Sequence, residues 1–262
     1  MTAGPIDLAY DVVGAGPPVL LLHGLFASGA NWREVAAGLA ATHRVYSVDL
    51  RNHGRSPRCA DMSYLAMADD VLRLIERQGL QRPALVGHSM GGKVAMALAL
   101  TAPWAVGRLA VIDVAPLTYV DRWSHQLQRV MATLLDEPPP GAAAVHSALA
   151  HWMIPRAAVG HAYVDWRSNL GAIAVSLHEL CAFPLHLRHL STPLPLHAIA
   201  GGRSDWVQPL GAATFQPMFP NARVEVIEDA GHWVHADRPQ ALLASLRRFL
   251  APSPRRLAAI AA

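Results

Sequence analysis

The amino-acid sequence predicts an α/β fold with a mostly parallel sheet. Strand-like and helix-like patterns alternate along most of the chain, which is typical of this class. Several strand patterns are continuous apolar runs, clearest at residues 19–22, as expected for strands covered on both faces. With 262 residues and a hydrophobic fraction of 52%, the chain is long and apolar enough for one large domain with a sizeable core.

The elements follow in chain order. Residues 6–13 alternate roughly between apolar and polar, which predicts an edge strand in a hairpin with the segment after Gly14-Ala15-Gly16. Apolar residues at helical spacing predict a helix at 64–78, and a run of helix formers predicts another at 93–100. The remaining predicted strands are residues 19–22, 43–48, 84–86, 109–112, 195–200 and 223–227. A predicted helix at 239–250 closes the domain.

The alternation stops between Pro116 and Leu190. Within this segment Pro138-Pro139-Pro140 interrupts the chain, and tryptophan and methionine recur among helix-like pieces. We interpret the segment as a helical cap inserted into the α/β core. The predicted domain organisation is therefore core at 1–116, cap at 117–190, core again at 191–251, and a tail at 252–262.

Composition excludes several classes of protein. The net charge is only +3 and no long basic run occurs, so the sequence offers no clustered basic face for nucleic acid. No apolar run reaches the roughly 18 residues that a membrane span needs. The N-terminus lacks the basic and apolar regions of a signal peptide, which predicts a soluble cytoplasmic protein. Cys59 and Cys181 match no metal or redox spacing, so no metal site is expected.

Residues 87–91 read Gly-His-Ser-Met-Gly and lie between a predicted strand and a predicted helix. In this context the pattern Gly-x-Ser-x-Gly indicates a nucleophilic serine on a sharp turn. The flanking glycines avoid a side-chain clash, and the turn holds the hydroxyl of Ser89 clear of the backbone. The start of the following helix favours a developing oxyanion. We therefore predict Ser89 as the nucleophile.

A serine nucleophile needs a general base and two oxyanion donors. His232, in a loop after the strand at 223–227, fits the chain order in which the base comes last. The predicted donors are the backbone N–H groups of Met90 and Leu25, with that of Phe26 as the alternative to Leu25. The side chains of Leu25, Phe26 and Met90 would line an acyl pocket. Trp233 is a further predicted substrate-binding residue.

Six motifs together resemble the α/β-hydrolase superfamily, and within it the small esterases of short and medium acyl esters. The motifs are Leu22-His23-Gly24-Leu25-Phe26, Asn31-Trp32, residues 49–56, residues 87–93, residues 111–116 and residues 231–236. The resemblance covers almost the whole chain and is weakest in the cap. It implies Ser89 as nucleophile, His232 as base, no cofactor, and a helical cap over the site.

Two aspartates fit the position of the triad acid. Asp205 follows the strand at 195–200, where most of the superfamily keeps its acid. Asp113 follows the strand at 109–112, where the resembled esterase branch keeps it. Strand-end geometry permits either carboxylate to accept from Nδ1 of His232. Both aspartates therefore remain candidates at this stage.

Two further groups have competing interpretations. Asp49, Arg51, His53 and Arg55 form a charged cluster, which we interpret as a loop joined by ion pairs rather than a substrate-binding loop. Lys93 could form a dyad with the serine, but its position one helical turn further on argues against this. His235 is expected to form local hydrogen bonds.

The predicted function is hydrolysis of small-molecule carboxylic esters with short to medium acyl chains, through an acyl-enzyme intermediate. The alternatives on the same triad are a carbon–carbon bond hydrolase, an amidase, a lactonase or a cofactor-free perhydrolase. A non-catalytic ligand sensor is the alternative from another class. A haloalkane dehalogenase or epoxide hydrolase is disfavoured, because each needs a carboxylate where Ser89 stands. We expect a monomer or a small homo-oligomer.

Overall fold

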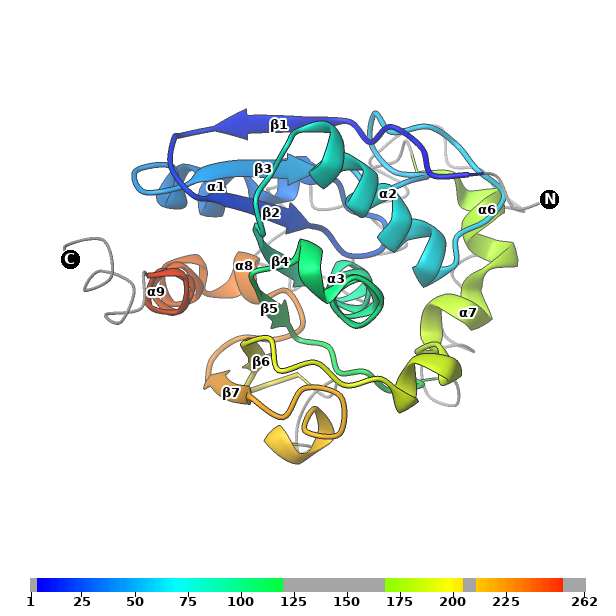
Figure 1. Cartoon of the computed structure of the whole chain (residues 1–262). Coiled ribbons are helices and arrows are strands. Elements are labelled where there is room, and N and C mark those ends of the chain that lie inside the picture. The colour runs from blue at the N-terminus through cyan, green and yellow to red at the C-terminus, as the bar shows by residue number, and fades with distance from the viewer. Residues whose placement is uncertain (1–3, 120–167, 205–210, 252–262) are drawn as a thin grey trace.

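The computed structural model describes residues 4–119, 168–204 and 211–251 (Figure 1). Its strands are β1 (Tyr10–Val13), β2 (Pro18–Leu22), β3 (Arg44–Val48), β4 (Ala84–His88), β5 (Arg108–Ile112), β6 (Leu196–Gly201) and β7 (Ala222–Ile227). Its α-helices are α1 (Arg33–Leu39), α2 (Tyr64–Arg77), α3 (Met90–Thr101), α6 (Leu170–Val175), α7 (Leu177–Cys181), α8 (Val234–Asp237) and α9 (Pro239–Leu250). The fold class predicted from the sequence is confirmed.

The strands form one sheet in the order β1-β3-β2-β4-β5-β6-β7. All neighbouring pairs are parallel except β1 with β3, which is antiparallel. The predicted hairpin of the first two strands is therefore wrong, because β3 lies between them. The connection crosses the start of β3, where Gly14 has a φ of 77°. A Cβ there would lie 2.3 Å from the carbonyl oxygen of His43, so the crossing leaves no room for a side chain.

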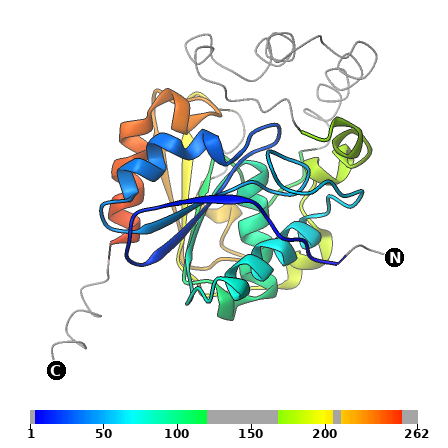
Figure 2. The same ribbon diagram turned by 90° about the horizontal axis from the view of Figure 1, so that it is seen from above.

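Helices cover both faces of the sheet, as the view in Figure 2 makes plain. One apolar cluster joins the sheet to α2 and α3, and the other joins it to α1 and α9. Alternate residues of β2 divide between them: Leu20 and Leu22 belong to the first cluster, and Val19 and Leu21 to the second. This burial on both sides explains the continuous apolar runs in the sequence.

The end of the predicted cap packs onto the core. Helices α6 and α7 and the 3-10 helix η5 (Leu185–His189) contribute buried side chains such as Ile173, Leu180 and Leu187 to the cluster that contains α2 and α3. The phenolic hydroxyl of Tyr64 on α2 donates to the carbonyl oxygen of Leu180 at 2.6 Å. Residues 120–167, most of the predicted cap, lie outside the described residues, as does the predicted tail at 252–262. The domain boundaries stay a prediction.

No helix within the described ranges is long and apolar enough to cross a membrane. Helix α1 was not anticipated from the sequence, because its seven residues include two alanines and a glycine and show little periodicity. Its residues Val35, Ala36 and Leu39 are nevertheless buried.

Candidate active site

Ser89 sits on a strained turn between β4 and α3. Its φ of 51° and ψ of −117° lie outside the usual regions for a residue with a side chain. A Cβ on Gly87 would lie 2.3 Å from the carbonyl oxygen of Gly91, and one on Gly91 would lie 2.4 Å from that of Leu22. Both positions must therefore be glycine. The turn leaves Ser89 partly exposed above the carboxyl ends of the strands.

His232 and Asp113 meet Ser89 at this edge of the sheet. Nε2 of His232 lies 3.2 Å from Oγ of Ser89, and Nδ1 lies 2.7 Å from Oδ2 of Asp113. Because a carboxylate accepts the hydrogen bond, the proton of the neutral imidazole belongs on Nδ1. The lone pair of Nε2 then faces the serine hydroxyl, which is the arrangement that proton abstraction requires.

The carboxylate of Asp113 is fully buried and accepts three hydrogen bonds. It follows β5, and it accepts from the backbone N–H of Gly201 at 2.9 Å and from the hydroxyl of Ser204, besides His232. A Cβ on Gly201 would lie 2.3 Å from the carbonyl oxygen of Gly231, so this glycine lets β6 and the His232 loop approach closely. The sequence did not point to Gly201 or Ser204.

Asp205, the other predicted acid, lies outside the described residues. Its neighbour Ser204 directs its hydroxyl to Asp113. Among the described residues, Asp113 is the carboxylate in contact with His232.

The loop after β2 lies against the serine. A Cβ on Gly24 would lie 2.8 Å from Nδ1 of His88 and 3.3 Å from Cβ of Ser89. Phe26 donates its backbone N–H to Nε2 of His53 at 3.3 Å, so this group is already engaged. That contact favours Leu25 over Phe26 as oxyanion donor. Met90 is the first residue of α3, so its N–H has no acceptor within the helix.

Two predicted pocket residues are almost fully buried. Phe26 and Trp233 are each 2% exposed. The indole of Trp233 lies beside the rings of His88 and His235, with centroids 5.2 and 5.5 Å away. Within the described part of the chain, the indole therefore packs inside the protein against these two histidines. Its role in substrate binding stays a prediction.

His88, the residue directly before Ser89, contacts the loop that carries His232. Nε2 of His88 donates to the backbone carbonyl oxygen of His232 at 2.8 Å, which ties the serine turn to the histidine loop. Burial, followed by the nearby His232, lowers the pKa of His88 well below its usual value, so the ring stays neutral. Burial also lowers the pKa of His235 to about 3. The sequence did not distinguish His88 among 14 histidines.

Lys93 points away from Ser89. Its ammonium donates to the carbonyl oxygens of Ala182 at 2.7 Å and Cys181 at 3.0 Å, at the C-terminal end of α7. It also lies 4.9 Å from the ring centroid of Tyr119. Burial lowers the pKa of this lysine to about 7. These contacts leave no place for a serine–lysine dyad.

The charged loop after β3 is joined by ion pairs, as predicted. Arg51 and Asp70 form a fully buried pair with Nε and Oδ2 2.6 Å apart. The carboxylate of Asp49 accepts from the backbone N–H groups of Gly29 at 2.7 Å and Arg55 at 3.0 Å. These contacts fix the loop from inside the protein.

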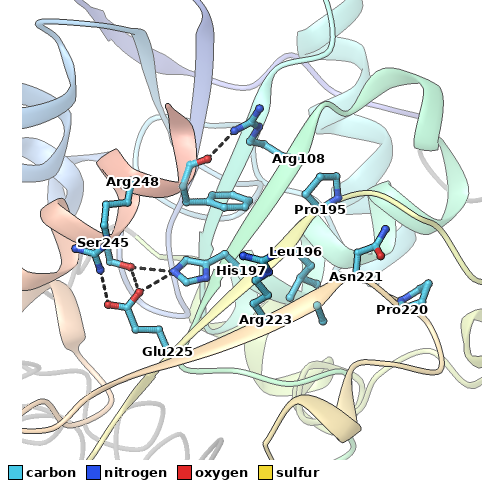
Figure 3. Close-up of a pocket in the computed structure, with 12 residues that line it drawn as sticks. Arg108, Pro195, Leu196, His197, Pro220, Asn221, Arg223, Glu225, Ser245 and Arg248 are labelled. Atoms are coloured by element: carbon cyan, nitrogen blue, oxygen red, sulfur yellow. Dashed lines mark hydrogen bonds and ion pairs between the residues drawn. The ribbon is translucent and has the colours of Figure 1, made fainter. Parts of the chain in front are cut away.

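A pocket of about 740 Å³ lies at the opposite edge of the sheet, where β5, β6 and β7 begin (Figure 3). Nε2 of His197 lies 3.1 Å from Oε2 of Glu225 and 2.9 Å from Oγ of Ser245. Arg248 donates to the same carboxylate at 2.7 Å. Acid and hydroxyl thus share one ring nitrogen, whereas a triad needs one partner on each nitrogen. This group therefore does not have the arrangement of a catalytic triad.

Among the described residues, no cluster of three or more His, Cys, Asp or Glu side chains is placed to hold a metal ion.

Comparison with known proteins places the chain in a family. The family model described as alpha/beta hydrolase fold matches residues 17–239. The chain belongs to this family. It is 32% identical over 266 residues to the sn-1-specific diacylglycerol lipase ABHD11 of Mus musculus, covering 94% of this chain and 86% of the relative. It is 32% identical over 238 residues to Esterase YbfF of Escherichia coli (strain K12), covering 89% and 92%.

A solved structure agrees with these relatives. This α/β hydrolase matches a marine microorganism esterase with a TM-score of 0.83 and 28% identity, covering 94% of this chain and 100% of the other. These three proteins are named as esterases or as a lipase, and each match covers 89% or more of this chain.

Proposed function

We propose that the protein is a carboxylic ester hydrolase that acts through Ser89, His232 and Asp113. One observation carries the proposal: the 3.2 Å contact between Nε2 of His232 and Oγ of Ser89, in a ring whose Nδ1 is held by a buried carboxylate. The names of the esterase and lipase relatives support the same class of reaction.

The first step is acylation. Oγ of Ser89 attacks the ester carbonyl carbon while Nε2 of His232 removes the hydroxyl proton. The negative charge passes to the carbonyl oxygen, which the N–H groups of Leu25 and Met90 stabilise. The C–O bond to the alcohol then breaks, and the protonated His232 gives its proton to the leaving alkoxide. Asp113 stabilises the imidazolium and keeps the ring in its orientation.

The second step is hydrolysis of the acyl-enzyme. Nε2 of His232 takes a proton from a water molecule, and the resulting nucleophile attacks the acyl carbon. The same two N–H groups hold the second oxyanion. When the bond to Oγ breaks, His232 returns the proton to Ser89 and the carboxylic acid leaves. This cycle needs no metal or organic cofactor.

The proposed substrates are esters with short to medium acyl chains. The side chains of Leu25, Phe26 and Met90, at and beside the two proposed oxyanion donors, are apolar, which suits an acyl group. A relative is named as a diacylglycerol lipase, so monoesters and diacylglycerols are both suitable test substrates. The cytoplasmic location and the monomeric or small homo-oligomeric state stay predictions from the sequence.

A p-nitrophenyl ester series from acetate to palmitate, together with a fluorophosphonate probe, tests the proposal. We expect hydrolysis with an optimum at short or medium chains, and labelling of one serine, identified as Ser89 by peptide mass spectrometry. Ser89→Ala should abolish both signals while leaving the circular dichroism spectrum unchanged. Wild-type protein that neither labels at Ser89 nor hydrolyses any ester above the buffer rate would exclude an esterase and favour the ligand sensor.

A further inference from the structure

Two histidines outside the proposed triad contact the loop that carries the Leu25 donor. Nδ1 of His23 lies 2.8 Å from the carbonyl oxygen of Gly24, and Nε2 of His53 receives the backbone N–H of Phe26 at 3.3 Å. The two rings are 5.0 Å apart in an edge-to-face arrangement. Both are 1% exposed. Each ring therefore meets one of the two peptide groups that flank Leu25.

The hydrogen bonds determine the tautomer of each ring. A backbone N–H can only donate, so the nitrogen that receives it must carry a lone pair. Nε2 of His53 accepts from Phe26, which leaves the proton on Nδ1, where it is donated to the carbonyl oxygen of Arg51 at 2.9 Å. Nε2 of His23 likewise accepts from the N–H of Leu50 at 3.0 Å. Both rings are therefore neutral and protonated on Nδ1.

These two contacts fix the direction of the Leu25 N–H. The carbonyl of Gly24 and the N–H of Leu25 belong to one planar trans peptide and point in opposite directions. Nδ1–H of His23 donates to the carbonyl oxygen of that peptide. The following peptide, between Leu25 and Phe26, donates its N–H to Nε2 of His53. The φ of Phe26 is 61°, a strained value for an aromatic residue, so this backbone needs external support to persist.

We propose that His53 is a positioning residue of the oxyanion hole: its neutral ring holds the Leu25–Phe26 peptide and thereby aims the N–H of Leu25 at the reacting carbonyl. This inference rests on the proposed function. The loop that carries His53 is itself fixed, because Asp49 accepts from Gly29 and Arg55, and Arg51 is paired with Asp70 inside the protein. His53 thus joins the fixed loop after β3 to the loop after β2 that carries Leu25.

Two substitutions separate this role from simple packing. The amide of glutamine reaches the place of Nε2 and can accept from Phe26, whereas the amide of asparagine reaches the place of Nδ1 and cannot. We expect His53→Asn to lower kcat roughly 10- to 100-fold, a loss no larger than that caused by removing a whole oxyanion donor. KM should change by less than about threefold. His53→Gln should stay within about threefold of wild type. His43→Asn, a buried histidine before β3, is the control for a general loss of packing.

Inhibitor binding gives a second readout. A trifluoromethyl ketone forms a tetrahedral adduct with the serine and needs the oxyanion hole, whereas the matching methyl ketone binds as a ketone. In His53→Asn the inhibition constant of the trifluoromethyl ketone should rise by the factor that kcat/KM falls. That of the methyl ketone should stay unchanged. Equal effects on both ketones, or equal losses in the Asn and Gln variants, would overturn the proposal.

A measurement on the wild-type protein covers the case in which His53→Asn does not fold. Long-range ¹⁵N–¹H NMR distinguishes the two tautomers of a neutral histidine, and the signal lost in His53→Gln identifies this ring. We expect a proton on Nδ1 and none on Nε2; a proton on Nε2 would refute the contact with Phe26. Wild-type protein without esterase activity would instead refute the proposed function, and the tautomer would still test the contact.

Discussion

The substitution Asp113→Asn tests the proposed acid and distinguishes it from Asp205. Three donors converge on the carboxylate: Nδ1–H of His232 and the hydroxyl of Ser204 on Oδ2, and the N–H of Gly201 on Oδ1. Asparagine has only one oxygen. The N–H of Gly201 cannot accept, whereas the hydroxyl and the imidazole can, so the asparagine oxygen must face Gly201.

The amide NH₂ then faces Nδ1 of His232 and requires a lone pair there. The imidazole responds by moving its proton to Nε2, the nitrogen that lies 3.2 Å from Oγ of Ser89. A protonated Nε2 cannot remove the serine proton. We expect kcat to fall about 10⁴-fold, the loss known for a triad acid changed to asparagine, which equals about 5.4 kcal/mol of activation free energy.

The assay is hydrolysis of p-nitrophenyl butyrate, with the rate of fluorophosphonate labelling as a second measure. Asp205→Asn is the matched control and should change kcat by less than about tenfold. Circular dichroism and thermal melting check that both variants fold. Activity of Asp113→Asn within about tenfold of wild type, or the large loss in Asp205→Asn instead, would refute Asp113 as the acid. Similar losses in both variants would mean that the two carboxylates act together.

Three further outcomes follow from the buried groups and glycines. Because the folded pKa of Lys93 is about 7 and its ordinary value is 10.5, the unfolded chain binds more protons between these values. The free energy of unfolding of wild type should therefore rise relative to Lys93→Met from pH 7 to pH 10, by up to about 1.4 kcal/mol per pH unit; a pH-independent difference in urea titrations would contradict this. Gly91→Ala would place a Cβ 2.4 Å from the carbonyl oxygen of Leu22, so the serine turn must shift. Because this shift moves the hydroxyl of Ser89 away from its reactive position, kcat should fall at least about tenfold. An unchanged kcat would refute the required glycine. Asp70→Asn leaves the buried Arg51 without its charge partner and should destabilise the fold by about 3–5 kcal/mol, measured by denaturant unfolding, whereas a loss under about 1 kcal/mol would show that the pair is hydrated.

Much of the fold could be predicted from local patterns. The apolar runs at β2 and β5 lie in the middle of the sheet and are buried on both faces, so they are recognisable without knowledge of their partners. The amphipathic helix α2 and the closing helix α9 were predicted within one residue of their bounds. Strand pairing was less accessible: β1 pairs with β3 rather than β2, because the order of strands depends on contacts between distant segments.

The candidate site divides in the same way. Ser89 carries a local signature, and His232 follows from chain order. Several supporting residues carry none: His88 and His53 are single histidines among 14, and their hydrogen-bond partners are 144 and 27 residues away. Lys93 was close enough in sequence to suggest a dyad, yet the packing of α7 directs its ammonium to backbone carbonyls.

By itself the sequence determined the class of fold, the family and the serine turn, because apolar periodicity and the two required glycines act over a few residues. Only the tertiary structure brought Asp113 to His232, engaged the N–H of Phe26 with His53 and turned Lys93 away from Ser89. Those outcomes depend on which strand ends and loops meet in space. Side-chain orientation and hydrogen-bond partners are set by contacts between residues far apart in the sequence, so no local pattern predicts them.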